Sequence, residues 1–134
     1  MNVAAQPTDH HTLLITLTGN DRPGVTSAIF ATLSGAGVHV LDIEQIVLRG
    51  RLVLGVLVSA PRDWKKLRAA VHRTAEALGM QVEVEAGVGD NKSRGEGRAH
   101  VTVIGMPLTA SAFGAVAGRI ADSGANIDRI ERMA

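Results

Sequence analysis

The chain has 134 residues, of which 46% are hydrophobic and 20% charged, with 14 basic and 13 acidic side chains. This near-neutral balance argues against bulk electrostatic binding to nucleic acid or to a membrane surface, and the lack of cysteine excludes disulfides and thiolate metal sites. Neither a signal peptide nor an apolar run of membrane-spanning length is present, so we expect a cytoplasmic globular chain.

Hydrophobic patterns of strand and helix type alternate over the first part of the chain. They predict strands at 12–18, 38–47, 51–59 and 81–85, with one helix that starts at Val25 and ends in the segment 35–37 and another from Trp64 to Leu78. Gly50 marks a tight return between the two middle strands, which indicates a hairpin. The alternating residues 81–85 are typical of an edge strand. The order βαββαβ predicts an α+β, ferredoxin-like fold.

The helices are predicted from apolar residues spaced three or four positions apart. Val25, Ile29 and Leu33 form such a stripe, and the second helix carries Trp64, Leu67, Val71 and Leu78. Asp63 stands where a side chain can cap the second helix, and Gly79 ends it.

The pattern begins again after a Gly-rich, charged linker at 87–97. Residues 99–104 repeat the first strand, a helical stripe follows at Phe113, Val116 and Ile120, and residues 124–132 align with residues 37–45. We therefore expect a flexible tail at 1–11, a first module at 12–86, the linker, and a partial second module (βαβ) at 98–134.

The second copy stops at Ala134, inside its expected second strand. A βαβ remnant leaves apolar faces and strand edges without partners. Three outcomes are open: the chain is a fragment, the remnant is disordered or cleaved, or it completes a sheet with another copy. A fragment that forms a homodimer is the outcome we favour.

The turn at residues 18–25 is the first candidate site. A strand ends there, a polar turn follows, and a helix starts at Pro23-Gly24, which leaves backbone N–H groups at the positive end of the helix. The N–H groups of Gly24, Val25 and Thr26 can take a ligand carboxylate, with Asp21 accepting from its ammonium or hydroxyl group and Asn20 able to do either. The alternative is structural: Asp21 caps the helix, and Pro23 and Gly24 only turn the chain.

Further candidates come from the second repeat. His39 and Asn126 occupy the same position in the two copies and are expected to face a ligand pocket between modules, with Asp128 two residues further on. Thr109 is placed to cap the second-repeat helix, and Ser111 stands roughly where Gly24 does in the first. The alternative for His39 and Asn126 is a half-buried polar residue at the start of a strand.

Other chemistry is not indicated. The remaining histidines lack metal-ligand spacing, and no nucleophile has a recognisable base, so we expect neither a metal nor a catalytic site. Lys92, Arg94 and Arg98 are too few to indicate nucleic-acid binding.

Residues 19–24 and 37–45 resemble an ACT domain, a small amino-acid-sensing regulatory module, and residues 108–117 with 126–128 resemble the start of a second one. The hairpin 47–58 and the tandem arrangement are similar to the N-terminal region of actinobacterial-type phosphoserine phosphatases. The resemblance implies a sensor of L-serine, bound between facing modules, ahead of a haloacid-dehalogenase-type catalytic domain. The Asp-x-Asp-x-Thr/Val motif of that domain does not occur in this chain, so Mg²⁺ is expected only for the missing domain and no cofactor here.

Two alternatives remain. An ACT pair of this kind can sense glycine or another amino acid for a gene regulator or a formyltetrahydrofolate hydrolase, or it can be a structural dimerisation module without a ligand.

Overall fold

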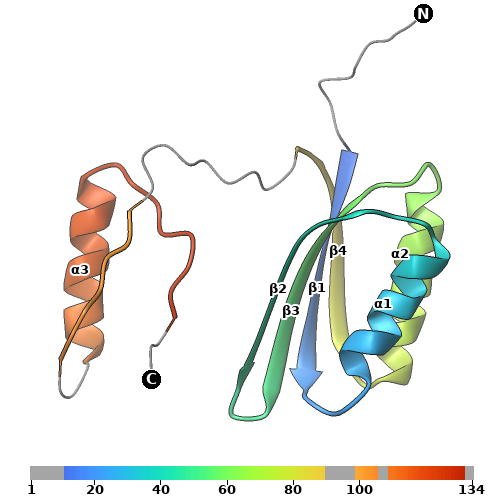
Figure 1. Cartoon of the computed structure of the whole chain (residues 1–134), viewed down its shortest axis with the longest axis horizontal. Coiled ribbons are helices and arrows are strands. Elements are labelled where there is room, and N and C mark those ends of the chain that lie inside the picture. Colours follow the sequence, from blue (N-terminus) through green and yellow to red (C-terminus); the bar gives the residue numbers. More distant parts are fainter. Residues whose placement is uncertain (1–10, 90–98, 106–108, 132–134) are drawn as a thin grey trace, which may run out of the picture. The chain divides into compact units, whose positions relative to one another are not determined.

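The computed structural model describes residues 11–89, 99–105 and 109–131. The chain divides into two compact units, Met1–Ser93 and Arg94–Ala134 (Figure 1). Most of the expected tail and of the expected linker lies outside the described residues.

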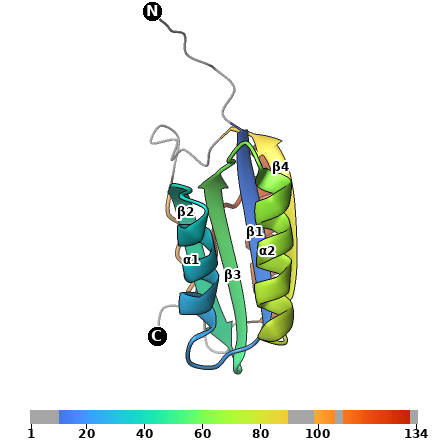
Figure 2. The ribbon, with the colours of Figure 1, turned by 90° about the vertical axis from the view of Figure 1, so that its right-hand side faces the viewer.

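The first unit is a four-stranded antiparallel sheet with two helices on one face (Figures 1 and 2). Its elements are β1 (His11–Asn20), α1 (Val25–Gly35), β2 (Val40–Leu48), β3 (Arg51–Ser59), α2 (Trp64–Ala77) and β4 (Gln81–Val88). The strand order is β2-β3-β1-β4, so β4 is an edge strand, as its alternation predicted. The βαββαβ prediction is confirmed.

Two strands are longer than the sequence pattern predicted. β1 begins at His11 and ends at Asn20, and β4 continues to Val88. At one end the reason is mutual pairing, since His11 lies opposite Val88 and each strand supplies hydrogen-bond partners for the other. At the other end β1 is extended by β3, because Gly19 and Asn20 lie opposite Leu52 and Arg51.

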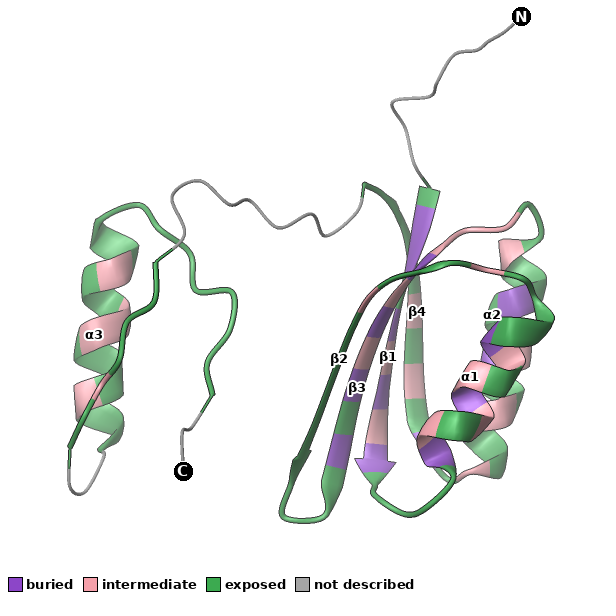
Figure 3. Cartoon of the chain, viewed as in Figure 1, coloured by how far each residue is buried: buried purple, intermediate pink, exposed green. Residues whose placement is uncertain are grey.

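The core lies between the sheet and the two helices. Alternate residues of β1 and β3 point into it and meet the apolar stripes of α1 and α2 (Figure 3). Its fully buried large side chains are Leu13, Ile15, Leu17, Val25, Ile29, Leu33, Leu52, Leu54, Val56, Val58 and Val71. Each such side chain contributes about 1.5–3 kcal/mol by its removal from water, which makes this layer the main source of the unit's stability.

The second face of the sheet carries no helix of the first unit (Figure 2). On β3 this face presents Val53, which is 37% exposed, and the half-buried Leu57. β2, the outermost strand beyond β3, is exposed almost throughout, although most of its residues are aliphatic. Its exposed large hydrophobic residues are Val40, Leu41, Ile43, Ile46, Val47 and Leu48.

The second unit contains one regular element among its described residues, α3 (Ala110–Asp122). Thr109 caps it, because its hydroxyl accepts a hydrogen bond from the Ala112 N–H at 3.1 Å, as predicted. The strands expected at 99–104 and after Gly124 are not formed in the described residues 99–105 and 125–131. A strand needs a neighbour for its N–H and C=O groups, and these segments have no ladder partner in the part of the chain that is described.

Candidate ligand-binding site

The turn between β1 and α1 leaves the start of the helix open. Gly24 is the N-cap residue, with φ 94°, and no side chain caps α1. The first regular helical hydrogen bond is that of Ala28 N–H to the Gly24 carbonyl, at 3.0 Å, while Val25 N–H reaches the Arg22 carbonyl only at 3.5 Å. The structural alternative for Asp21, capping of this helix, is therefore absent from the structure. The positive end of α1 keeps donors that an anion can use.

Gly24 is needed for its backbone conformation. A φ of 94° lies in a region that L side chains rarely adopt, and a β-carbon placed there would meet nothing within 4 Å. The space over this residue is open, so the approach to the helix start is unobstructed.

Exposure divides the candidate residues of this turn into two groups. Asn20, Asp21, Pro23 and Gly24 are exposed. The next two positions turn inward: Val25 is 1% exposed and belongs to the core, and Thr26 is half-buried. Ligand contacts at Val25 therefore involve its backbone N–H and not its side chain.

The turn is held against the β2–β3 hairpin by two hydrogen bonds. Asp21 N–H donates to the Gly50 carbonyl at 2.8 Å, and Thr26 Oγ1 donates to Gln45 Oε1 at 2.7 Å. Gln45 was not predicted from the sequence. The available signal was a polar residue at alternate spacing between Ile43 and Val47, but its partner is 19 residues away and becomes evident only from the packing of α1 on the sheet.

His39 lies at the opposite end of the sheet from this turn. Its N–H donates to Ser59 Oγ and its carbonyl accepts from Ser59 N–H, both at 2.9 Å, at the end of β3. Asn20 lies opposite Arg51, at the start of β3. The length of β3 separates them, roughly 27 Å at about 3.4 Å per residue, so one copy of the first unit does not bring His39 to the turn.

The candidates of the second unit are all exposed. Thr109 uses its hydroxyl as the α3 cap, and Ser111 lies in the first turn of that helix. Asn126 and Asp128 lie in the segment after α3, outside any strand.

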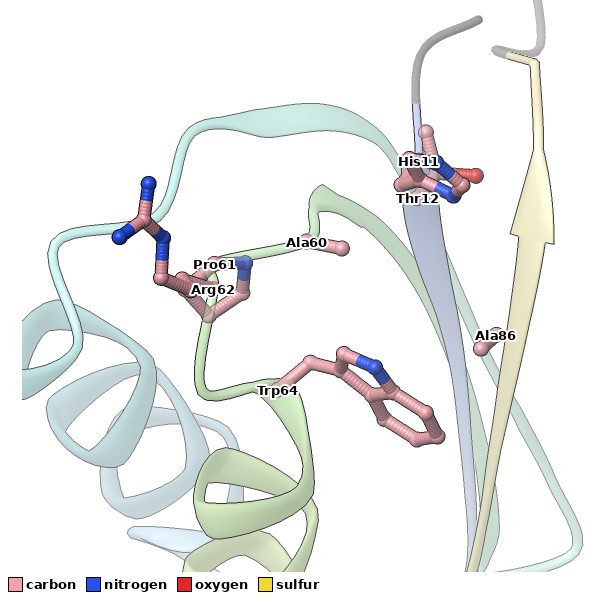
Figure 4. Close-up of a pocket in the computed structure, with 7 residues that line it drawn as sticks. All are labelled: His11, Thr12, Ala60, Pro61, Arg62, Trp64 and Ala86. Atoms are coloured by element: carbon pink, nitrogen blue, oxygen red, sulfur yellow. The ribbon is translucent and has the colours of Figure 1, made fainter.

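Two hollows occur elsewhere on the first unit. One of about 260 Å³ lies between the start of β1 and the start of α2, where the Trp64 indole points toward β1 and β4 and Arg62 points away from it (Figure 4). The other, about 530 Å³, is a shallow groove on the open face of the sheet around Leu14, Gly55 and Leu57. Neither is lined by a predicted site residue.

Within the described ranges, no group of three histidine, aspartate or glutamate side chains is placed to hold a metal ion. In the same ranges, no helix has both the length and the apolar character needed to cross a bilayer.

Comparison with known families gives two matches. A model described as an ACT domain matches residues 11–85, and a second ACT-domain model matches residues 98–134. A solved ACT domain protein from Streptococcus pneumoniae superposes with a TM-score of 0.52 at 22% identity, over 57% of this chain and 90% of that one. The structural likeness agrees with the fold of the first unit.

Two curated relatives match almost the whole chain. A phosphoserine phosphatase of Streptomyces coelicolor is 53% identical over 133 residues, which are 98% of this chain and 32% of that protein. A phosphoserine phosphatase of Mycobacterium tuberculosis is 46% identical over 121 residues, which are 88% of this chain and 30% of that protein. The chain thus spans about a third of the length of these relatives.

Proposed function

Because the chain belongs to the ACT-domain family, we propose that it senses a small amino acid, L-serine, as the regulatory region of a phosphoserine phosphatase. The chain is a regulatory ACT region and not a catalytic domain. The observation that carries the proposal is the uncapped start of α1 behind the exposed turn at Asn20 to Gly24.

The turn suits the carboxylate of an amino acid. The backbone N–H groups of Val25 and Thr26 lie at the positive end of an 11-residue helix, where a negative group is stabilised. Asp21 is exposed beside this end and offers a carboxylate to the ammonium group of the same ligand. An α-amino acid carries both a carboxylate and an ammonium group, whereas inorganic phosphate would be repelled by Asp21.

A second copy of the chain supplies the other wall of the site. β2 is an edge strand of the four-stranded sheet and carries aliphatic side chains on both faces, a combination that favours pairing with another strand. If two β2 strands pair antiparallel about a two-fold axis, the start of one lies beside the end of the other. The partner's His39 then approaches the turn at Asp21, where it can receive the hydroxyl of L-serine.

Regulation follows from differential affinity. A ligand bound between two copies favours the paired arrangement only to the extent that it binds that arrangement more tightly. The same difference in ligand affinity limits how far an attached catalytic domain can respond.

The proposal is tested by calorimetric titration of the chain with L-serine, glycine and other small amino acids, together with the shift of the melting temperature. We expect saturable binding of L-serine. Gly24→Ala should weaken it at least about tenfold, because the strained residue displaces the first N–H groups of α1.

The matched control is Gly37→Ala, at the other end of α1. Gly37 also has a positive φ, 66°, with nothing within 4 Å of a β-carbon, so it carries a similar conformational cost without touching the turn. If no amino acid gives either a heat of binding or a shift of the melting temperature, the proposal is overturned. If both variants bind L-serine equally well, the turn is not part of the site.

A further inference from the structure

The candidate turn and the exposed edge strand are joined by a side-chain hydrogen bond. Thr26 is the second residue of α1, and Gln45 lies in the middle of β2. Thr26 Oγ1 donates to Gln45 Oε1 at 2.7 Å. A contact of this kind links the start of a helix directly to the strand that would pair with a second copy.

Gln45 is a polar residue in an otherwise apolar row. It lies opposite Leu54, on the helix-covered face of the sheet, and its neighbours on that face of β2 are Ile43, opposite Val56, and Val47, opposite Leu52. Gln45 is also exposed, so its carboxamide is not required to fill the core. What the side chain supplies at this position is the hydrogen bond to Thr26.

A second hydrogen bond holds the other side of the turn. Asp21 N–H, which precedes Gly24, donates to the Gly50 carbonyl in the loop of the β2–β3 hairpin. Thr26, which follows Gly24, is bound to the same hairpin through Gln45. The turn is thus attached at both flanks to one hairpin.

We propose that Gln45 is a positioning residue that couples the turn to β2 through Thr26. The ligand in this inference rests on the proposed function, whereas the coupling itself rests on the hydrogen bond. An amino acid held by the N–H groups of Val25 and Thr26 fixes the first turn of α1, and through Gln45 it fixes the edge strand. Because coupling between sites is reciprocal, pairing of β2 with a second copy must also favour the conformation of the turn that binds the amino acid.

The first test needs no ligand. Amide hydrogen exchange is measured on the whole chain for Gln45→Met and Thr26→Val, which remove the bond with little change of volume, and for the double variant. We expect Thr26→Val to speed exchange in β2, and Gln45→Met to speed exchange at Ala28, each about 3- to 10-fold. The double variant should show no further increase, and Thr26→Ser, which keeps the hydroxyl, should behave as the parent chain.

Thr16 and Gln81 provide a matched control. They lie in β1 and β4, outside the candidate turn, so Thr16→Val and Gln81→Met repeat the same chemical changes elsewhere in the sheet. These variants should leave exchange at Ala28 and in β2 unchanged. The coupling is wrong if Thr26→Val leaves β2 unaffected, or if the effects of the two single variants simply add.

The second test uses L-serine as the probe and the dimer dissociation constant, measured by analytical ultracentrifugation, as the readout. In the parent chain the constant should change with L-serine, and Gln45→Met should still dimerise while losing most of that change. If Gln45→Met and Thr26→Val respond as the parent does, the coupling is overturned. If the parent itself ignores every amino acid while the exchange effects persist, the proposed ligand function fails and the coupling stands.

Discussion

Arg49 adopts a left-handed backbone conformation in the turn between β2 and β3. Its φ is 50°, and that of the following Gly50 is 73°. Leu48 and Arg51 pair on either side, so this is a two-residue hairpin loop with two positive φ values, as in a type I′ turn. Asparagine and glycine accept this conformation readily, whereas a long side chain is strained in it. The Gly50 carbonyl receives the Asp21 N–H, so the strain lies beside the candidate site.

Replacement of Arg49 by asparagine is expected to stabilise the chain by about 0.5–1 kcal/mol, since an Asn-Gly pair is favoured in this type of turn. Urea unfolding followed by circular dichroism measures the change. Arg51→Asn is the control: Arg51 starts β3, where asparagine is disfavoured, so no gain is expected there. Equal or lower stability of Arg49→Asn would contradict the assignment of strain.

At the level of elements, the two edge strands of the sheet differ in character. β2 exposes Ile43 and Ile46, 47% and 48% exposed, which lie on opposite faces because they pair with Val56 and Val53. β4 carries the exposed Glu83 on its open face. Both strands carry two acidic residues, Asp42 and Glu44 on β2 and Glu83 and Glu85 on β4. The difference lies in the exposed aliphatic side chains, which are numerous on β2 and limited to Val88 on β4, and this favours β2 as the pairing edge.

Ile43→Lys is expected to raise the dimer dissociation constant at least about tenfold, because it places a charge at the proposed contact. The monomer should lose little stability, since Ile43 is 47% exposed. Sedimentation velocity measures association, and Glu83→Lys serves as the control on β4. If Glu83→Lys weakens association and Ile43→Lys does not, the pairing strand is β4 and not β2.

At the level of the whole molecule, the two units differ in what they bury. The first encloses the hydrophobic core between its sheet and two helices, whereas α3 has no buried residue. The inward stripe of α3, at Ala112, Val116, Ala117 and Ile120, is only half-buried, and a 13-residue helix with so little burial is marginally stable in water. The described residues of the second unit therefore supply little packing energy of their own.

The two units are expected to behave differently when prepared separately. Residues 1–93 should unfold cooperatively, with a midpoint within a few degrees of that of the whole chain. Residues 94–134 should show little helix and no cooperative transition by circular dichroism, because a single helix without a paired sheet lacks a core. A sharp thermal transition of the shorter piece by itself would contradict this expectation.

Much of the first unit could be predicted from local patterns. The spacing of Val25, Ile29 and Leu33 identified α1 and its buried face, and Gly50 located the hairpin. Thr109 was correctly predicted to cap its helix. The other capping expectation was only half right: Asp63 occupies the N-cap position of α2, but its side chain makes no capping hydrogen bond.

The candidate site could be predicted only in part. The turn at Asn20 to Gly24 and its open helix start follow from a short segment, since a glycine with positive φ and a following helix are local features. Gln45 escaped prediction because its bond to Thr26 requires both the strand register and the docking of α1. The distance of His39 from the turn within one copy likewise depends on tertiary pairing, because Asn20 lies opposite the start of β3 and His39 is bound at its end.

By itself, the sequence determined the order of elements in the first unit, their buried faces and the position of the turn, since hydrophobic periodicity and turn chemistry act over a few residues. Only the tertiary structure decided that β2 is an exposed edge, that the turn is tied to its hairpin, and that the strands expected in the second unit are not formed in its described residues. The physical reason is that a strand is completed by partners distant in the chain, which a local pattern does not specify.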